Sequence, residues 1–232
     1  APNAVDTNRF LPIPEDRHYR AAKKIPADGP VIGFAGSLVQ YEGLDLLIQA
    51  SEKLGREGIE HQVVITGSGA AERDLRDLAK RSPNSNVSFL GRLPQAEIPR
   101  LMSTFDIVAC PRRSQLVTEL VSPLKPLESF SAGIATILSD VAPNADLAGS
   151  LEAPRAALFK AGDVEDLTEK LRNLILDSEF RAELGRRARL WTVRDRSWTS
   201  VGREIAGSLS EARQTHSASG QPLSLIHISE PT

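Results

Sequence analysis

The fold is decided by the stretch Pro30-Val-Ile-Gly-Phe-Ala-Gly36 and by the segment that follows it. The stretch is short and apolar and ends in glycine, which is typical of a buried parallel strand. Residues 42–54 then place Leu44, Leu47 and Ile48 on one face of a helix. A strand followed directly by an amphipathic helix begins a βαβ unit, so we expect a parallel sheet.

The same alternation continues along the chain, and after residue 163 it changes to helices alone. Asp163, with Asp166 three residues later, resembles a capping box at a helix start. The predicted class is therefore α/β: a Rossmann-like parallel sheet of five to six strands flanked by helices, with C-terminal helices. The further strands are expected at 62–66, 86–90, 105–110, 135–138 and 156–159, and helices after Gly67-Ser-Gly69 and at 95–103, 123–132, 178–191 and 197–212.

Composition excludes several classes of protein. The 232 residues carry a net charge of -2, which argues against nucleic acid as the main partner. A single cysteine, Cys110, excludes a disulfide framework and a cysteine-based zinc site. No apolar run reaches the roughly 18–20 residues of a membrane span, and no signal peptide is visible. The chain begins at Ala1 without an initiator Met, so we expect a processed chain or a fragment. The lack of export signals favours a cytoplasmic location.

The last residues differ in character from the rest. Residues 223–232, LSLIHISEPT, resemble the in-frame translation of a sequencing adapter; the alternative is a natural disordered tail. We therefore expect 215–232 to be a disordered or artefactual tail and exclude 223–232 from the fold.

The order of the motifs resembles the C-terminal half of the retaining GT-B glycosyltransferases of group 1. Individually the motifs are weak, and their ordered set is specific. The tail motif Asp195-Arg-Ser-Trp198 resembles exopolysaccharide-type members. The other motifs are Pro2-Asn-Ala-Val-Asp6, Gly36-Ser-Leu38, Ile65-Thr-Gly-Ser-Gly69, Val87-Ser-Phe-Leu-Gly91 and Pro123-Leu-Lys-Pro-Leu-Glu128.

The resemblance implies that two domains bind the two substrates separately. Residues 1–29 would connect from a missing N-terminal domain, and 30–214 would form the domain that binds a nucleoside-diphosphate sugar. The missing domain would hold a glycan or lipid-linked acceptor, with contact to the inner membrane surface if the acceptor is lipid-linked. The activity implied is hexosyl or N-acetylhexosaminyl transfer with retention, without metal or cofactor. The fragment alone would be inactive.

By the same resemblance, Glu128 accepts hydrogen bonds from the ribose hydroxyls of the donor. Bidentate hydrogen bonding of two hydroxyls to a carboxylate is sound chemistry. The family's first motif glutamate is displaced here. Glu119 either recovers its contact with the donor sugar through a bulged loop or is a solvent carboxylate. Ser122 lies in the same loop with the same alternatives.

The diphosphate also needs positive charge, because an unpaired dianion in a cleft is costly. The family's Arg and Lys after the first strand are replaced here by Ser37 and Glu42. Lys125, at the start of the helix that carries Glu128, is the leading substitute and the expected stabiliser of the leaving group. The further candidates for donor binding are Arg112, Arg113, Ser37 and Gly36 for the phosphates, and Arg92 and Leu93 for the base.

Two other functions remain open from the sequence. A sugar-nucleotide epimerase of GT-B architecture would bind the same ligand but would need an acid/base pair in the cleft. A degenerate domain without catalysis would only bind or pack.

Overall fold

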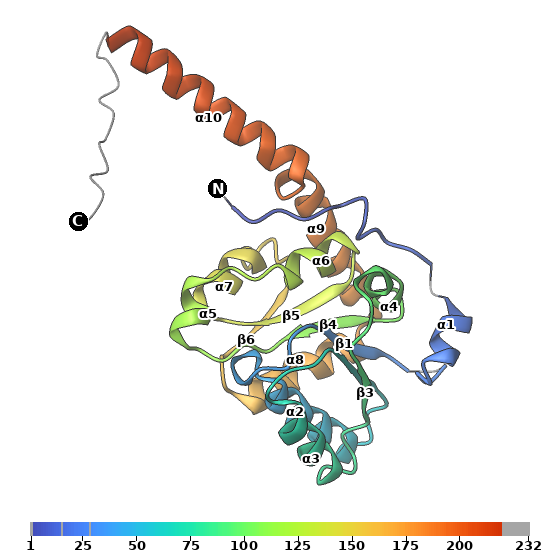
Figure 1. Ribbon diagram of the computed structural model, residues 1–232. Coiled ribbons are helices and arrows are strands. Elements are labelled where there is room, and N and C mark those ends of the chain that lie inside the picture. The colour runs from blue at the N-terminus through green and yellow to red at the C-terminus, as the bar shows by residue number, and fades with distance from the viewer. Residues whose placement is uncertain (1, 15, 28, 220–232) are drawn as a thin grey trace, which may run out of the picture.

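The computed structural model describes residues 2–14, 16–27 and 29–219, and its centre is one parallel sheet of six strands. The strand order is β3-β2-β1-β4-β5-β6, so the direction of strand addition reverses between β1 and β4 (Figure 1). The predicted parallel sheet, including its sixth strand, is confirmed. The strands are β1 (Val31–Ala35), β2 (Gln62–Thr66), β3 (Val87–Gly91), β4 (Ile107–Cys110), β5 (Ala135–Ser139) and β6 (Ala157–Phe159).

Alternate residues of the strands enter two apolar clusters, one on each face of the sheet. In β1, Ile32 and Phe34 belong to one cluster and Val31 to the other. Such alternation follows from the two-residue period of a strand, and burial of both faces explains why the strands are apolar throughout. The first cluster packs under α2 (Leu44–Arg56), α3 (Glu72–Lys80) and α8 (Val164–Leu176), and the second under α4 (Ile98–Met102), α6 (Lys125–Ser131), α7 (Ala142–Ala148) and α9 (Ser178–Asp195).

The C-terminal helices begin as the sequence predicts. The Asp163 carboxylate accepts hydrogen bonds from the backbone N–H groups of Glu165 (3.0 Å) and Asp166 (3.1 Å), which caps α8. The last helix, α10 (Trp198–Ser219), continues past the expected end at residue 212. Figure 1 shows α10 projecting away from the body of the domain. The predicted adapter-like stretch 223–232 lies outside the described residues.

Several short helices were not predicted. The segment before β1 contains α1 (Arg17–Ala22), whose Tyr19 and Arg20 are buried, so part of this segment packs against the domain. The helix expected at 95–103 divides into the 3-10 turn η2 (Gln95–Glu97) and α4. The helix expected at 123–132 begins at Lys125, with Pro126 in its first turn. The remaining additions are η1 (Gln40–Glu42), α5 (Leu116–Leu120) and α7.

Candidate functional site: a cleft at the strand ends

A cleft of about 870 Å³ lies where the carboxyl ends of β1, β2 and β3 face the start of α6. Open α/β sheets bind ligands at this edge, beside the point where the strand order reverses. The volume suits a ligand of the size of a nucleotide sugar. The predicted site residues that line it are Gly36, Ser37, Arg92, Leu93 and Glu128.

Gly36 and Gly67 bring backbone without side chains to the cleft wall. The Gly67 N–H donates to Gly91 O (2.8 Å) and the Gly36 N–H to Thr66 O (3.0 Å), which joins the three turns into one surface. Gly67 has φ +135°, and a Cβ there would overlap the carbonyl oxygen of Gly36. Position 67 therefore requires glycine for two reasons, the positive φ and the lack of space for a Cβ. Because no side chain covers the backbone there, a ligand can approach it closely.

Glu128 stands in the first turn of α6, opposite these turns. The side chain is half-buried, and among the described residues none donates a hydrogen bond to its carboxylate. Burial raises the pKa of Glu128 above its usual range, while the positive charges of Arg9 and Lys125 oppose that rise. A desolvated acceptor without a protein partner is suited to bind hydroxyl groups of a ligand.

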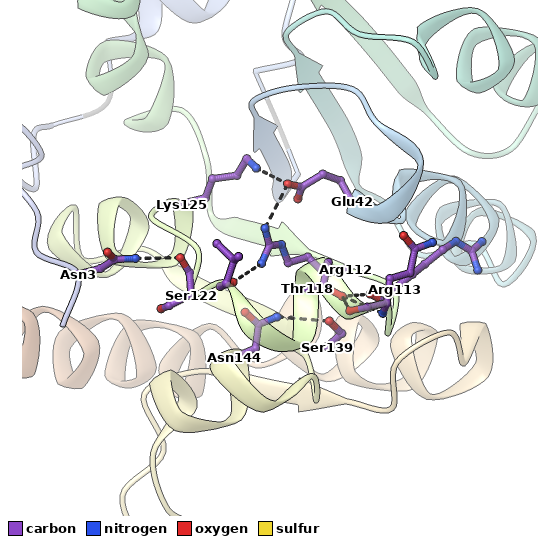
Figure 2. Close-up of polar contacts among 11 residues, drawn as sticks. Asn3, Glu42, Arg112, Arg113, Thr118, Ser122, Lys125, Ser139 and Asn144 are labelled. Carbon is purple, nitrogen blue, oxygen red and sulfur yellow. Dashed lines mark hydrogen bonds and ion pairs between the residues drawn. The ribbon is translucent and has the colours of Figure 1, made fainter. Parts of the chain in front are cut away.

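Lys125 begins α6 and lies across the turn after β1. Its stem fills the space that a side chain at Gly36 would occupy, and its Nζ is 5.3 Å from the ring centroid of Phe34. The ammonium donates to Glu42 Oε1 at 2.6 Å (Figure 2). The cation predicted for the diphosphate is thus beside the cleft wall, and it is already paired with a carboxylate.

The two arginines after β4 take different positions. Arg112 is buried, donates from Nη1 to Val121 O at 3.0 Å and has Nη2 3.8 Å from Glu42 Oε1. Arg113 pairs with Asp45 at a separate hollow of about 460 Å³. Neither residue lines the cleft that holds Glu128.

Glu119 and Ser122 line another hollow, on the side of α5 and α7. Glu119 accepts from Ser114 Oγ (2.6 Å) and from the Ala142 N–H (3.0 Å) at the start of α7. These two hydrogen bonds lower the pKa of Glu119. The backbone carbonyl of Ser122 accepts from Asn3 Nδ2 at 2.8 Å. The structure therefore separates this pair from Glu128.

Other residues of the cleft were not assigned to it from the sequence. Thr66, Ser68 and Gln95 bring polar groups to its walls, and Phe10 contributes an apolar surface from the N-terminal segment. Phe10 is held there because its carbonyl accepts from Ser131 Oγ on α6 at 2.6 Å. Ser68 could have been found from its place in the Gly67-Ser-Gly69 turn after a strand, whereas only the folded chain brings Phe10 to the cleft.

Within residues 2–14, 16–27 and 29–219, no group of three or more His, Cys, Asp or Glu side chains is placed to hold a metal ion. No helix in the described part of the chain is long and apolar enough to cross a membrane.

The sheet and its cleft define a Rossmann-like α/β domain, and comparison identifies its family. The sequence model described as "Glycosyl transferases group 1" matches residues 15–191, and the chain belongs to that family. A curated relative, "GDP-mannose-dependent monoacylated alpha-(1-6)-phosphatidylinositol monomannoside mannosyltransferase" of Corynebacterium glutamicum, is 33% identical over 214 residues. That alignment covers 90% of this chain and 55% of the relative, so the chain spans about half the length of this relative.

Solved structures confirm the predicted fold. The C-terminal domain of the group 1 family protein LpcC from Francisella tularensis matches with a TM-score of 0.71 and 19% identity, over 84% of this chain and 99% of that one. Anabaena HepE in complex with UDP-glucose matches with a TM-score of 0.75 and 21% identity, over 90% of this chain and 56% of that one. The domain has the Rossmann-like fold of GT-B proteins.

Proposed function

We propose that this chain is the donor-binding half of a retaining glycosyltransferase that moves a sugar from a nucleoside diphosphate to a glycan or lipid-linked acceptor. The observation that carries the proposal is the cleft itself, where Glu128 is half-buried, receives no hydrogen bond from the described residues and faces the glycine turns after β1 and β2. Glu128 would accept hydrogen bonds from the ribose. The turns would let the diphosphate approach backbone N–H groups closely.

In this proposal the leaving diphosphate is stabilised by positively charged side chains that are positioned before the donor binds. Lys125 lies at the cleft wall, and preorganised positive charge at a developing anion is a large catalytic contribution. Arg112 would add to the field from its buried position, and Arg113, Glu119 and Ser122 would reach the donor only if the loop after β4 moved. The acceptor would bind to the rest of the whole protein, so we expect the chain alone to transfer no sugar.

The relatives suggest which donors to test first. The name of the Corynebacterium relative specifies GDP-mannose, and the Anabaena structure holds UDP-glucose. A lipid-linked acceptor, as in the name of the mannosyltransferase, would bring the whole enzyme to the cytoplasmic membrane surface.

Calorimetric titration of the 232-residue chain with GDP, UDP and ADP tests the proposal. We expect saturable binding of one nucleotide, and Glu128→Gln should weaken it about 10- to 100-fold, the loss of at least one charged hydrogen bond. The matched control is Glu169→Gln, an exposed carboxylate on α8, which should bind as the wild type does. A folded chain that binds none of the three nucleotides contradicts the proposal and favours a domain that has lost its ligand.

A further inference from the structure

The carboxylate of Glu42 lies buried between two cations at the edge of the cleft. Its side chain is 3% exposed, and Oε1 is 2.6 Å from Lys125 Nζ and 3.8 Å from Arg112 Nη2 (Figure 2). Glu42 Oε2 and Arg112 Nε are buried without a hydrogen-bond partner in the described part of the chain. A buried carboxylate is costly unless it is paired, and Lys125 and Arg112 supply the opposite charge here.

The backbone holds Glu42 in one position. Gly43, directly after it, has φ +68°, and a Cβ there would overlap the carbonyl oxygen of Pro111. The Arg113 N–H also donates to Tyr41 O at 2.9 Å. The turn that carries Glu42 is thus pressed against the end of β4, and this backbone position puts the Glu42 carboxylate within hydrogen-bond distance of Lys125 Nζ.

The position of the Lys125 side chain follows from that of Glu42. Its stem crosses Gly36, a residue of the cleft wall, and its side chain is 23% exposed. Lysine has several rotatable bonds, and without a partner its ammonium would extend into water. With one N–H given to Glu42, two remain for the oxygens of a ligand.

We propose that Glu42 is a positioning residue for the donor, whose carboxylate holds the Lys125 ammonium across Gly36 where the diphosphate binds. This inference rests on the proposed function. Glu42 touches no ligand and acts through Lys125. With Arg112 the three groups carry a formal charge of +1, so the cluster still attracts an anion. Diphosphate recognition in this chain therefore depends on a pair of residues, 83 positions apart, rather than on a lysine alone.

A double-mutant cycle with the nucleoside diphosphate that the wild type binds tests this role. Glu42→Ala should weaken binding about 2- to 12-fold, the cost of ordering one long side chain during binding. In the Lys125→Met background the same change should cause no further loss, because there is no ammonium left to position. Glu42→Gln keeps an oxygen that accepts from Lys125 and should recover part of the affinity.

Asp45→Asn is the matched control, because it breaks an ion pair of the neighbouring helix turn that does not line the cleft. It should leave the affinity unchanged. If Glu42→Ala binds as tightly as the wild type or more tightly, or weakens binding equally in both backgrounds, the positioning role is wrong while the proposed function stands. If Glu42→Ala does not fold, the same cycle with Glu42→Gln decides. If the wild type binds no nucleotide, the proposed function fails first, and this role fails with it.

Discussion

The half-buried carboxylate of Glu128 should affect folding and binding in opposite directions. Burial raises its pKa in the folded chain, so folding favours the protonated form. The resulting stabilisation is fully present below the pKa of the unfolded chain, near 4.5, and is lost as the pH rises through the raised folded value. At pH 7 the ionised group therefore opposes folding, as is common at functional sites.

Glu128→Gln removes that opposition, since the amide resembles the protonated acid. We expect the variant to need more urea than the wild type to unfold at pH 7, and the difference to vanish near pH 4. Its nucleotide affinity should fall at the same time. If the wild type is more stable than Glu128→Gln at pH 7, then the ionised Glu128 makes a stabilising contact in the folded chain, and the prediction is wrong.

At the scale of elements, the sequence predicts those helices and strands whose positions are determined by a local sequence pattern. The strands and the long helices have a clear period, and Asp163 marks the start of α8 through hydrogen bonds within one turn. Helices α1, α5 and α7 have five to seven residues, too few for a period to show. Helix α7 is instead held by long-range contacts: its Leu147 and Ala148 enter an apolar cluster, and the Ala142 N–H donates to the carboxylate of Glu119, 23 residues earlier.

The residues of the candidate site also fall into those that the sequence predicts and those that it does not. Gly36, Ser37, Arg92 and Leu93 follow strand ends, and parallel strands bring such residues to one edge. The loop after β4 leaves the same edge, but contacts such as that of Glu119 with Ala142 determine its further course, so the separation of Glu119 from Glu128 could not be predicted. Nor could the pairing of Lys125 with Glu42, which arises only when two distant turns meet in the fold.

The turn after β2 gives a prediction at this scale. In Gly67→Ala the new methyl group meets the carbonyl oxygen of Gly36, so two turns must shift and the cleft must widen. We expect a loss of about 1–3 kcal/mol in the free energy of unfolding, measured in urea, together with weaker nucleotide binding. Gly202→Ala is the control, because no atom lies within 4 Å of its new Cβ, and the free energy of unfolding should stay within about 0.5 kcal/mol of the wild type. A Gly67 variant that unfolds like the wild type would contradict the close approach of the turns.

At the scale of the whole molecule, stability is unevenly distributed. The sheet and α8 share a continuous apolar cluster, in which Leu167, Leu171 and Leu174 are fully buried. Helix α10 is different: Val201 is buried, and every residue from 202 to 210 is exposed. A helix without tertiary packing is marginal in water, so this part of α10 should open far more often than the domain unfolds.

Hydrogen exchange checks this distribution directly. Amides of 203–210 should exchange orders of magnitude faster than those of α8, and nucleotide binding should slow exchange in the turns after β1 and β2 without changing it in α10. Replacing Ile205 and Leu209 by Ala should leave the free energy of unfolding within about 0.5 kcal/mol of the wild type, because both side chains are exposed. Equal protection of α10 and α8 would mean that its exposed residues Ile205 and Leu209 are covered in solution, for example by a second copy of the chain.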